Sequence, residues 1–124
     1  MVKVNAVAFI GYPVTDVARA RAFYENVLGL TLSFAHEIQP GQWWVEYEIE
    51  GVALALSNLW APSGQSQAGP VLALEVADLD GALESLLAQK IPVIYGPLDT
   101  PACRLAGITD PDGNGLTLHQ RKAS

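Results

Sequence analysis

The sequence predicts an α+β fold made of two tandem βαβββ modules, and two observations lead to it. Several short apolar segments alternate with period two, as strands do, while two others carry apolar residues at helical spacing. The order of these segments repeats at an offset of 62 residues, half of the 124 in the chain, so that Asp16 aligns with Asp78 and Ala20 with Ala82. Such internal similarity indicates two copies of one supersecondary unit.

The first module, residues 1–58, is expected to contain one helix and four strands. Thr15 or Asp16 caps the helix, because a short polar side chain there can accept the unpaired N–H groups of its first turn. The Glu50-Gly51 pair is a tight-turn signal between two strands. The predicted elements are strand 4–12, helix 17–28, strand 31–35, loop 36–42, and strands 43–49 and 52–58.

The second module, residues 70–124, repeats this order after a linker over 59–69 that is rich in Gly, Ser, Gln and Pro. Asp78 is the expected helix cap. The predicted elements are strand 71–76, helix 80–90, strand 92–95, loop 96–102, and strands 103–109 and 115–120. We expect one domain, 1–124, in which the paired modules form a cup-shaped mixed sheet with the helices outside and a concave cleft between them.

Composition excludes several classes of function. The net charge is −6 and the 7 basic residues are scattered, which argues against nucleic acid as a partner. No apolar run approaches the ~20 residues that cross a bilayer, so we expect no membrane partner. The N-terminal segment has no signal-peptide pattern, and the chain has one cysteine, Cys103; both features favour the cytoplasm.

Strand alternation predicts which side chains face the cleft. The bulky apolar parity, with Leu54 and Leu116, is expected under the helices, and the smaller, more mixed parity in the cleft. If Glu50-Gly51 is a tight turn, Glu46 pairs with Ala55 and Trp44 pairs with Ser57. The side chains of Trp44 and Glu46 then face the cleft. The same parity in the second module directs Arg104 and Ile108 inward.

Two segments carry a resemblance to a known superfamily. The front of the chain, FIGYPVTDVARARAFYENVLGL, and the back, ITDPDGNGLTL, resemble the vicinal oxygen chelate superfamily of glyoxalase I, the bleomycin resistance proteins and the extradiol dioxygenases. The resemblance covers nearly the whole chain. It implies the glyoxalase/bleomycin resistance/dioxygenase fold and a homodimer, and it leaves the function open because this fold hosts several chemistries.

The resemblance also locates the metal site of the metal-dependent members. Their ligands, typically His, Gln or Glu, come from the first and last strand of each module. A transition metal needs about three or four imidazole, thiolate or carboxylate donors. The matching positions here are hydrocarbon except for one neutral hydroxyl, so we expect no metal and no cofactor at this site. These positions are Phe9, Ala55, Val71 and Thr117.

A rearranged site is the alternative. His119 and Glu75 are candidates for hydrogen bonding, general-base catalysis or metal binding in the cleft, whereas His36 is expected in a solvated loop. Cys103 is either a structural strand thiol or a nucleophile activated by Arg104. Whether the protein is an enzyme is left open.

The favoured hypothesis is a metal-independent protein that sequesters an aromatic or cationic small organic molecule in the cleft, as the bleomycin resistance branch does. The tryptophans offer a stacking surface, although a dimer contact would also explain them. The alternatives are a lyase, isomerase or oxygenase with a rearranged site, and an interaction module with a filled cleft. The candidate ligand-binding residues are Phe9, Trp44, Glu46, Ala55, Ser57, Trp60, Val71, Glu75, Arg104, Thr117 and His119.

Overall fold

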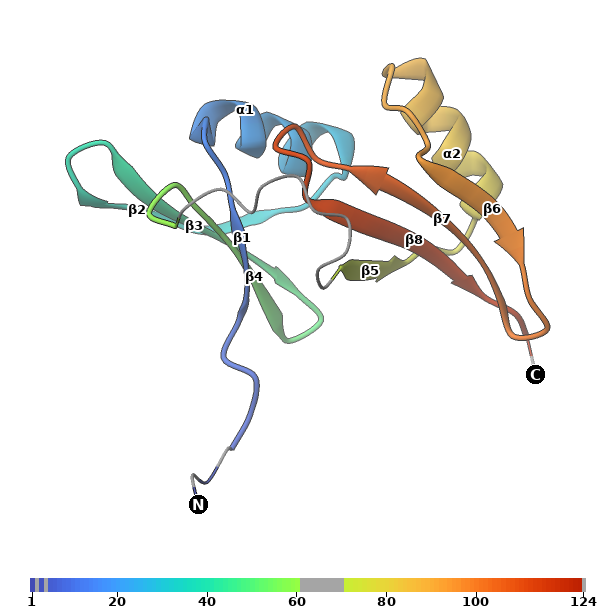
Figure 1. The fold of residues 1–124 in the computed structure, drawn as a ribbon, viewed down its shortest axis with the longest axis horizontal. Coiled ribbons are helices and arrows are strands. Elements are labelled where there is room, and N and C mark those ends of the chain that lie inside the picture. Colours follow the sequence, from blue (N-terminus) through green and yellow to red (C-terminus); the bar gives the residue numbers. More distant parts are fainter. Residues whose placement is uncertain (2, 4, 61–70, 124) are drawn as a thin grey trace. The chain divides into compact units, whose positions relative to one another are not determined.

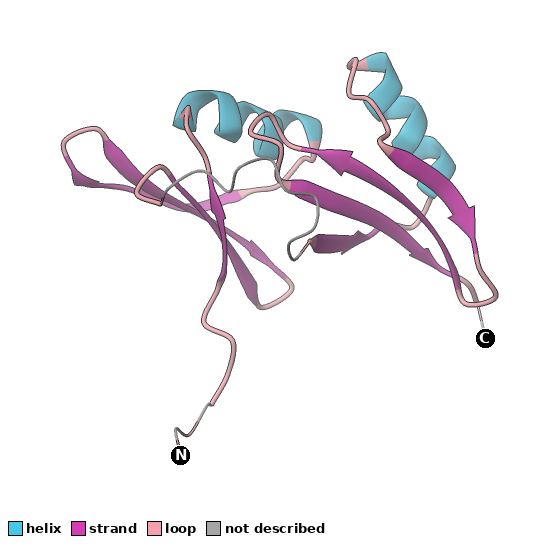
Figure 2. Cartoon of the chain, viewed as in Figure 1, coloured by secondary structure: helices cyan, strands magenta, loops and turns pink. Residues whose placement is uncertain are grey.

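The computed structural model describes residues 1, 3, 5–60 and 71–123 (Figure 1). The chain divides into two compact units, unit 1 with Met1–Ser63 and unit 2 with Gly64–Ser124. Each unit contains a four-stranded mixed sheet and helical structure (Figure 2), which confirms the predicted α+β fold of two βαβββ modules. Apart from Leu59 and Trp60, the predicted linker lies outside the described residues. The cleft between the modules stays a prediction from the sequence.

The sheet of unit 1 has the strand order β1-β4-β3-β2. β1 runs parallel to β4, and the other neighbours are antiparallel. The elements are β1 Ile10–Pro13, α1 Val17–Ala22, the π-helical turn η1 Phe23–Val27, β2 Leu32–Gln39, β3 Gln42–Ile49 and β4 Val52–Ser57.

The helix of unit 1 begins at the predicted cap. The Asp16 carboxylate accepts the backbone N–H of Arg19 at 3.0 Å, which satisfies one of the unpaired donors of the first turn. The helix then widens, because the N–H of Leu28 reaches back five residues to the carbonyl of Phe23. Phe23 and Tyr24 are thereby turned onto the sheet and buried.

A partly buried polar network joins α1 and η1 to β3. The Tyr47 hydroxyl donates to Glu25 Oε2 at 2.9 Å, and the Arg21 Nε donates to the same oxygen at 2.7 Å. The hydrogen bond from Arg21 is the largest cause that lowers the pKa of Glu25, and burial is the largest cause that raises the pKa of Tyr47. Glu25 is therefore held in its charged form under the helix.

Two predictions for unit 1 need correction. β1 pairs with β4 from Ile10 onward, so the strand is shorter than the predicted 4–12. β2 is longer than predicted and includes most of the expected loop 36–42, because Pro40 and Gly41 form a tight turn into β3, with Gly41 at φ 80°. His36 consequently lies in a strand and not in a loop.

The sheet of unit 2 has the strand order β5-β8-β7-β6, and α2 runs along it (Figure 1). The Asp78 carboxylate accepts the N–H of Gly81 at 3.1 Å, which confirms that cap. The elements are β5 Leu72–Glu75, α2 Leu79–Ala88, β6 Tyr95–Asp99, β7 Cys103–Thr109 and β8 Gly115–Arg121.

The position of β6 differs from the prediction of strand 92–95 and loop 96–102. Gly96 and Pro97 lie inside the observed strand, although glycine and proline usually mark a loop. β6 tolerates them because it is an edge strand whose register shifts between Tyr95 and Leu98.

The register confirms the internal repeat. Ile10 pairs with Leu54 in unit 1, and Leu72 pairs with Leu116 in unit 2, at the predicted offset of 62 residues. Leu54 and Leu116 are each 1% exposed and belong to the cores of their units. Among the described residues, no helix is long and apolar enough to cross a membrane.

Candidate functional site

The two faces of the unit 1 sheet differ in what covers them. Tyr47 and Leu54 pair across β3 and β4 on the face under η1, where Tyr24 stacks on Tyr47 with ring centroids 5.9 Å apart. The other face carries Trp44 opposite Ser57 and Glu46 opposite Ala55, which confirms the predicted hairpin register. We call this second side the open face of unit 1.

An aromatic cluster of Phe9, Trp44 and Trp60 lies on the open face. Trp44 meets Phe9 and Trp60 edge to face, with centroids 5.0 and 5.1 Å apart, and Phe9 and Trp60 stack at 6.2 Å. Gly11 makes this possible, because a Cβ there would lie 2.6 Å from Trp60 Cη2. Phe9 is 41% exposed, so the cluster presents an aromatic surface to its surroundings.

Glu46 gives this surface a negative charge. The indole N–H of Trp44 donates to Glu46 Oε2 at 2.6 Å, which fixes both side chains. Ala55 and Ser57 are fully buried; the Ser57 hydroxyl donates to the Trp43 carbonyl at 2.7 Å and accepts the N–H of Leu59. These two residues support the cluster from below and offer no free polar group to a ligand.

Two residues of the open face were missed in the sequence. In the observed β2, Phe34 pairs with Glu46 and His36 pairs with Trp44. The rings of Phe34 and His36 stack on each other with centroids 6.0 Å apart. Phe34 is 50% exposed. The Pro40-Gly41 turn signal could have revealed them, because a tight turn there extends β2 to His36.

In unit 2, Thr117 is covered by a residue that the sequence analysis also missed. The Tyr95 hydroxyl lies 2.7 Å from Thr117 Oγ1, and the Tyr95 ring occupies the space that a side chain at Gly107 would need. An isolated glycine inside a strand signals such a close approach. Tyr95 and Thr117 line an open hollow of about 380 Å³, together with Val71, Ile94, Ile108, Gly115 and Leu116.

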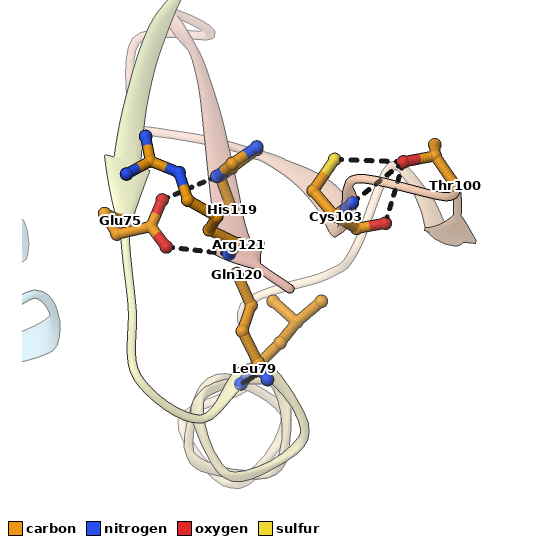
Figure 3. A network of polar contacts seen from close by, with 7 residues as sticks. All are labelled: Glu75, Leu79, Thr100, Cys103, His119, Gln120 and Arg121. Atoms are coloured by element: carbon orange, nitrogen blue, oxygen red, sulfur yellow. Dashed lines mark hydrogen bonds and ion pairs between the residues drawn. The ribbon is translucent and has the colours of Figure 1, made fainter. Parts of the chain in front are cut away.

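Glu75 and His119 form a pair (Figure 3). The register places both on the same face of the unit 2 sheet as Thr117. His119 Nδ1 lies 2.6 Å from Glu75 Oε1, and the backbone N–H of Arg121 donates to Glu75 Oε2 at 2.7 Å. The hydrogen bond from Arg121, followed by that from His119, lowers the pKa of Glu75. The structure thus joins the two residues that the sequence offered as candidate catalytic groups.

The prediction that Arg104 and Ile108 face inward with Thr117 is wrong. Arg104 pairs with Gln120 in the sheet and contacts Asp80 of α2 at 3.0 Å, while Ile108 is fully buried. The cause is the turn after β7, in which the Asp110 N–H donates to the Asn114 carbonyl. That turn, residues 110–114, is three residues longer than Glu50-Gly51, and an odd difference in turn length reverses the faces of a strand.

Cys103 faces a different partner from the one considered in the sequence. Its Sγ lies 3.3 Å from Thr100 Oγ1, and the same hydroxyl accepts the backbone N–H of Cys103 at 2.9 Å (Figure 3). Arg104 is the next residue of the strand and points to the opposite face. Arg104 is therefore on the other side of the sheet from the thiol that it was expected to activate.

The residues at the family's metal positions do not fit a metal. Phe9, Ala55 and Val71 have hydrocarbon side chains, and the Thr117 hydroxyl is hydrogen-bonded to Tyr95. Among the described residues there is also no group of three or more His, Cys, Asp or Glu side chains that could hold a metal ion.

Comparison with known proteins identifies the superfamily. The family model described as Glyoxalase/Bleomycin resistance protein/Dioxygenase superfamily matches residues 5–118. No curated protein matches the sequence.

Solved structures agree with the family model. TnmS3, an antibiotic binding protein from Streptomyces sp. CB03234, is 28% identical with a TM-score of 0.78, covering 98% of this chain and 100% of that one. A glyoxalase/bleomycin resistance protein from the same organism is 30% identical, with a TM-score of 0.73 and coverages of 93% and 100%. The fosfomycin resistance protein FosX from Listeria monocytogenes shares the fold at 16% identity, with a TM-score of 0.76 and coverages of 95% and 94%. The chain therefore belongs to the glyoxalase/bleomycin resistance protein/dioxygenase superfamily.

Proposed function

We propose that this protein binds and sequesters an aromatic or cationic small organic molecule without using a metal, and that the open face of unit 1 supplies the contact surface. The observation that carries the proposal is the partly exposed cluster of Phe9, Trp44 and Trp60 beside the carboxylate of Glu46. Similarity to an antibiotic binding protein over 98% of the chain supports a small-molecule ligand.

The chemistry of the cluster favours a planar cation. Aromatic rings stack on or meet edge to face with another planar ring system, and their faces attract positive charge. Glu46 adds a full negative charge next to Trp44, at a point where the indole N–H already orients the carboxylate. A planar anion of the same size would meet repulsion from the same group.

A fluorescence titration tests the proposal, because Trp44 and Trp60 would be quenched by a stacked ligand. We expect saturable quenching by proflavine, a planar aromatic cation, and binding about tenfold weaker for anthracene-2-carboxylate, a planar anion. Trp44→Phe should weaken proflavine binding more than Trp43→Phe, because Trp43 lies on the opposite face of β3.

A matched pair of charge variants tests whether binding depends on the charge of Glu46 itself or only on the overall negative charge of the protein. Glu46→Gln keeps an acceptor for the Trp44 indole and removes the charge, whereas Glu48→Gln removes an equal charge two residues away on the same face, opposite Ala53. We expect about a fivefold loss of proflavine affinity in the first variant and little change in the second. Equal losses in both, or none in either, would contradict the proposal.

An enzyme with a rearranged site is the second candidate function, favoured by the hydrogen-bonded pair of Glu75 and His119. Arg104 is not part of it, because it pairs with Asp80 on the other face. Turnover of a hemithioacetal or a catechol that is lost in His119→Ala would establish this function. Elemental analysis of protein purified without chelator would reveal a bound metal.

We further propose a homodimer in the cytoplasm. The homodimer is implied by the superfamily, and exposed apolar side chains on edge strands, such as Phe34 and Leu98, could contribute to a contact. The lone Cys103 suits a reducing compartment. Light scattering of the purified protein tests the dimer: a mass of 13.2 kDa at all concentrations would exclude it.

A further inference from the structure

The pair of Glu75 and His119 has the geometry of a proton acceptor. The two residues are direct neighbours on the parallel strands β5 and β8, and His119 Nδ1 lies 2.6 Å from the carboxylate. Glu75 is held on its other side by the backbone N–H of Arg121. A carboxylate on Nδ1 fixes the tautomer and orientation of the ring and stabilises an imidazolium. In the described part of the chain, this is the ring's single hydrogen bond, which leaves Nε2 for a ligand.

We propose that Glu75 and His119 form a proton-accepting site that binds the acidic hydroxyl group of a phenol or enol. The site lies on the side of the unit 2 sheet away from α2, which we call the open face of unit 2. In the bound state the O–H bond breaks, its proton moves to His119 Nε2, and the electron pair stays on the oxygen. Glu75 remains ionised and faces the imidazolium. The step needs no metal, oxidant or further reactant.

The hollow beside the pair offers space for the rest of such a molecule. Thr117, in its wall, precedes His119 by two residues on the same face of β8, a separation of roughly 7 Å along a strand. Val71 contributes an apolar wall, and Tyr95 contributes an aromatic ring. One benzene ring in the hollow can therefore direct a hydroxyl group toward the imidazole.

The groups that face His119 from the neighbouring strands favour this chemistry. Glu75 of β5 supplies a negative charge, and Leu105 of β7 lies opposite His119 with an apolar side chain. Arg121, two residues further along β8, supplies a positive charge, and the Cys103 thiol lies opposite Arg121. A phenolate at Nε2 would thus meet the imidazolium as its direct partner.

The test uses 4-nitrophenol as the probe, since its ionised form has a separate visible absorption band, and nitrobenzene as the analogue without a hydroxyl. We expect the wild-type protein to bind nitrophenol in its ionised form, to shift the ring proton signal of His119 in NMR, and to bind nitrobenzene about tenfold more weakly. His119→Gln should weaken nitrophenol binding about tenfold and abolish the ionised band. Glu75→Gln should reduce the ionised fraction several-fold.

Arg104→Gln is the control, because it changes a side chain of the same sheet that points to the opposite face, toward Asp80 of α2. It should leave nitrophenol binding unchanged. Circular dichroism should show that all three variants fold, since the pair is half exposed, with side-chain exposures of 29% for His119 and 52% for Glu75. Equal nitrophenol binding by wild type and His119→Gln, an unaffected ionised fraction in Glu75→Gln, or binding without ionisation would each overturn the proposal. None of these outcomes bears on proflavine binding by unit 1.

Discussion

Unit 1 and unit 2 share buried leucines at equivalent positions on the faces of their sheets that bear the helices. Leu54 and Leu116 occupy equivalent register positions, and both are buried to 1% exposure. The caps Asp16 and Asp78 are also equivalent and accept the same N–H group of the first helical turn. The duplicated features are therefore those that fold each module: a buried apolar face and a capped helix.

The open faces of the two units have diverged. Where unit 1 places Ala55 and Ser57 under an aromatic cluster, unit 2 places Thr117 and His119, bonded to Tyr95 and Glu75. Buried positions are restricted by packing, whereas an open face can change its chemistry without unfolding the sheet. The comparison indicates that one repeated fold carries two different surfaces. The following variants test this difference between the two units.

The largest effect is expected when the shared core is truncated. Leu54→Ala and Leu116→Ala should each lower the free energy of unfolding by about 2–5 kcal/mol, because both remove a fully buried side chain at equivalent positions. Urea denaturation followed by circular dichroism measures it. A cost near zero for one of the two would show that the two cores are not equivalent.

Gly11 and Gly107 lie against the aromatic rings of Trp60 and Tyr95, and their replacement by alanine should cost different amounts of stability. Gly107→Ala is expected to cost about 1–3 kcal/mol, since the new Cβ displaces Tyr95 and breaks its hydrogen bond to Thr117. Gly11→Ala should cost less than about 1 kcal/mol, because Trp60 lies outside the strands and can move, but it should change tryptophan fluorescence and proflavine binding. A larger loss of stability in Gly11→Ala than in Gly107→Ala would contradict this prediction.

The network under η1 should make unit 1 sensitive to acid. Tyr47→Phe removes a buried hydroxyl that donates to Glu25 and should cost about 1 kcal/mol at neutral pH. The folded pKa of Glu25 is lowered, so its contribution is present above the unfolded pKa of about 4.3 and is lost as the pH falls through the folded pKa.

Unfolding measured at several pH values therefore tests this network through Glu25→Gln. The variant should be less stable than wild type at neutral pH, and the difference should shrink below about pH 4. A difference that stays constant down to pH 2 would argue against a charged Glu25 in the folded protein.

The smallest effect is expected from Arg104. Its ion pair with Asp80 lies on the surface, where Asp80 is 74% exposed, so Arg104→Gln should leave the free energy of unfolding nearly unchanged. Proflavine and nitrophenol binding should be unchanged. A clear loss of binding of either probe would restore Arg104 to the ligand site.

Elements set by local signals could be predicted from the sequence. The cap at Asp16, the turn at Glu50-Gly51 and the pairing of Trp44 with Ser57 depend on residues close together in the chain, and all three predictions are confirmed. The parallel strand pairs have the same register in both units, at the predicted offset of 62 residues.

Local signals did not predict which way the side chains of β7 point or the residue at which β2 ends. Arg104 was misplaced because the register of β7 against β8 is shifted by one residue from the register that the repeat predicts, and such a shift reverses the faces of a strand. His36 was missed because a polar stretch before Pro40 was taken for a loop. Tyr95 was missed because its partner Thr117 is distant in sequence.

The most direct test of the ligand surface follows the three indole N–H signals of the protein by NMR during titration with proflavine. The signals of Trp44 and Trp60, which lie in the aromatic cluster of unit 1, should shift strongly and saturate together, while that of Trp43 on the opposite face should barely move. If Trp44 and Trp60 do not respond to proflavine while the protein binds it elsewhere, the open face of unit 1 is not the binding surface.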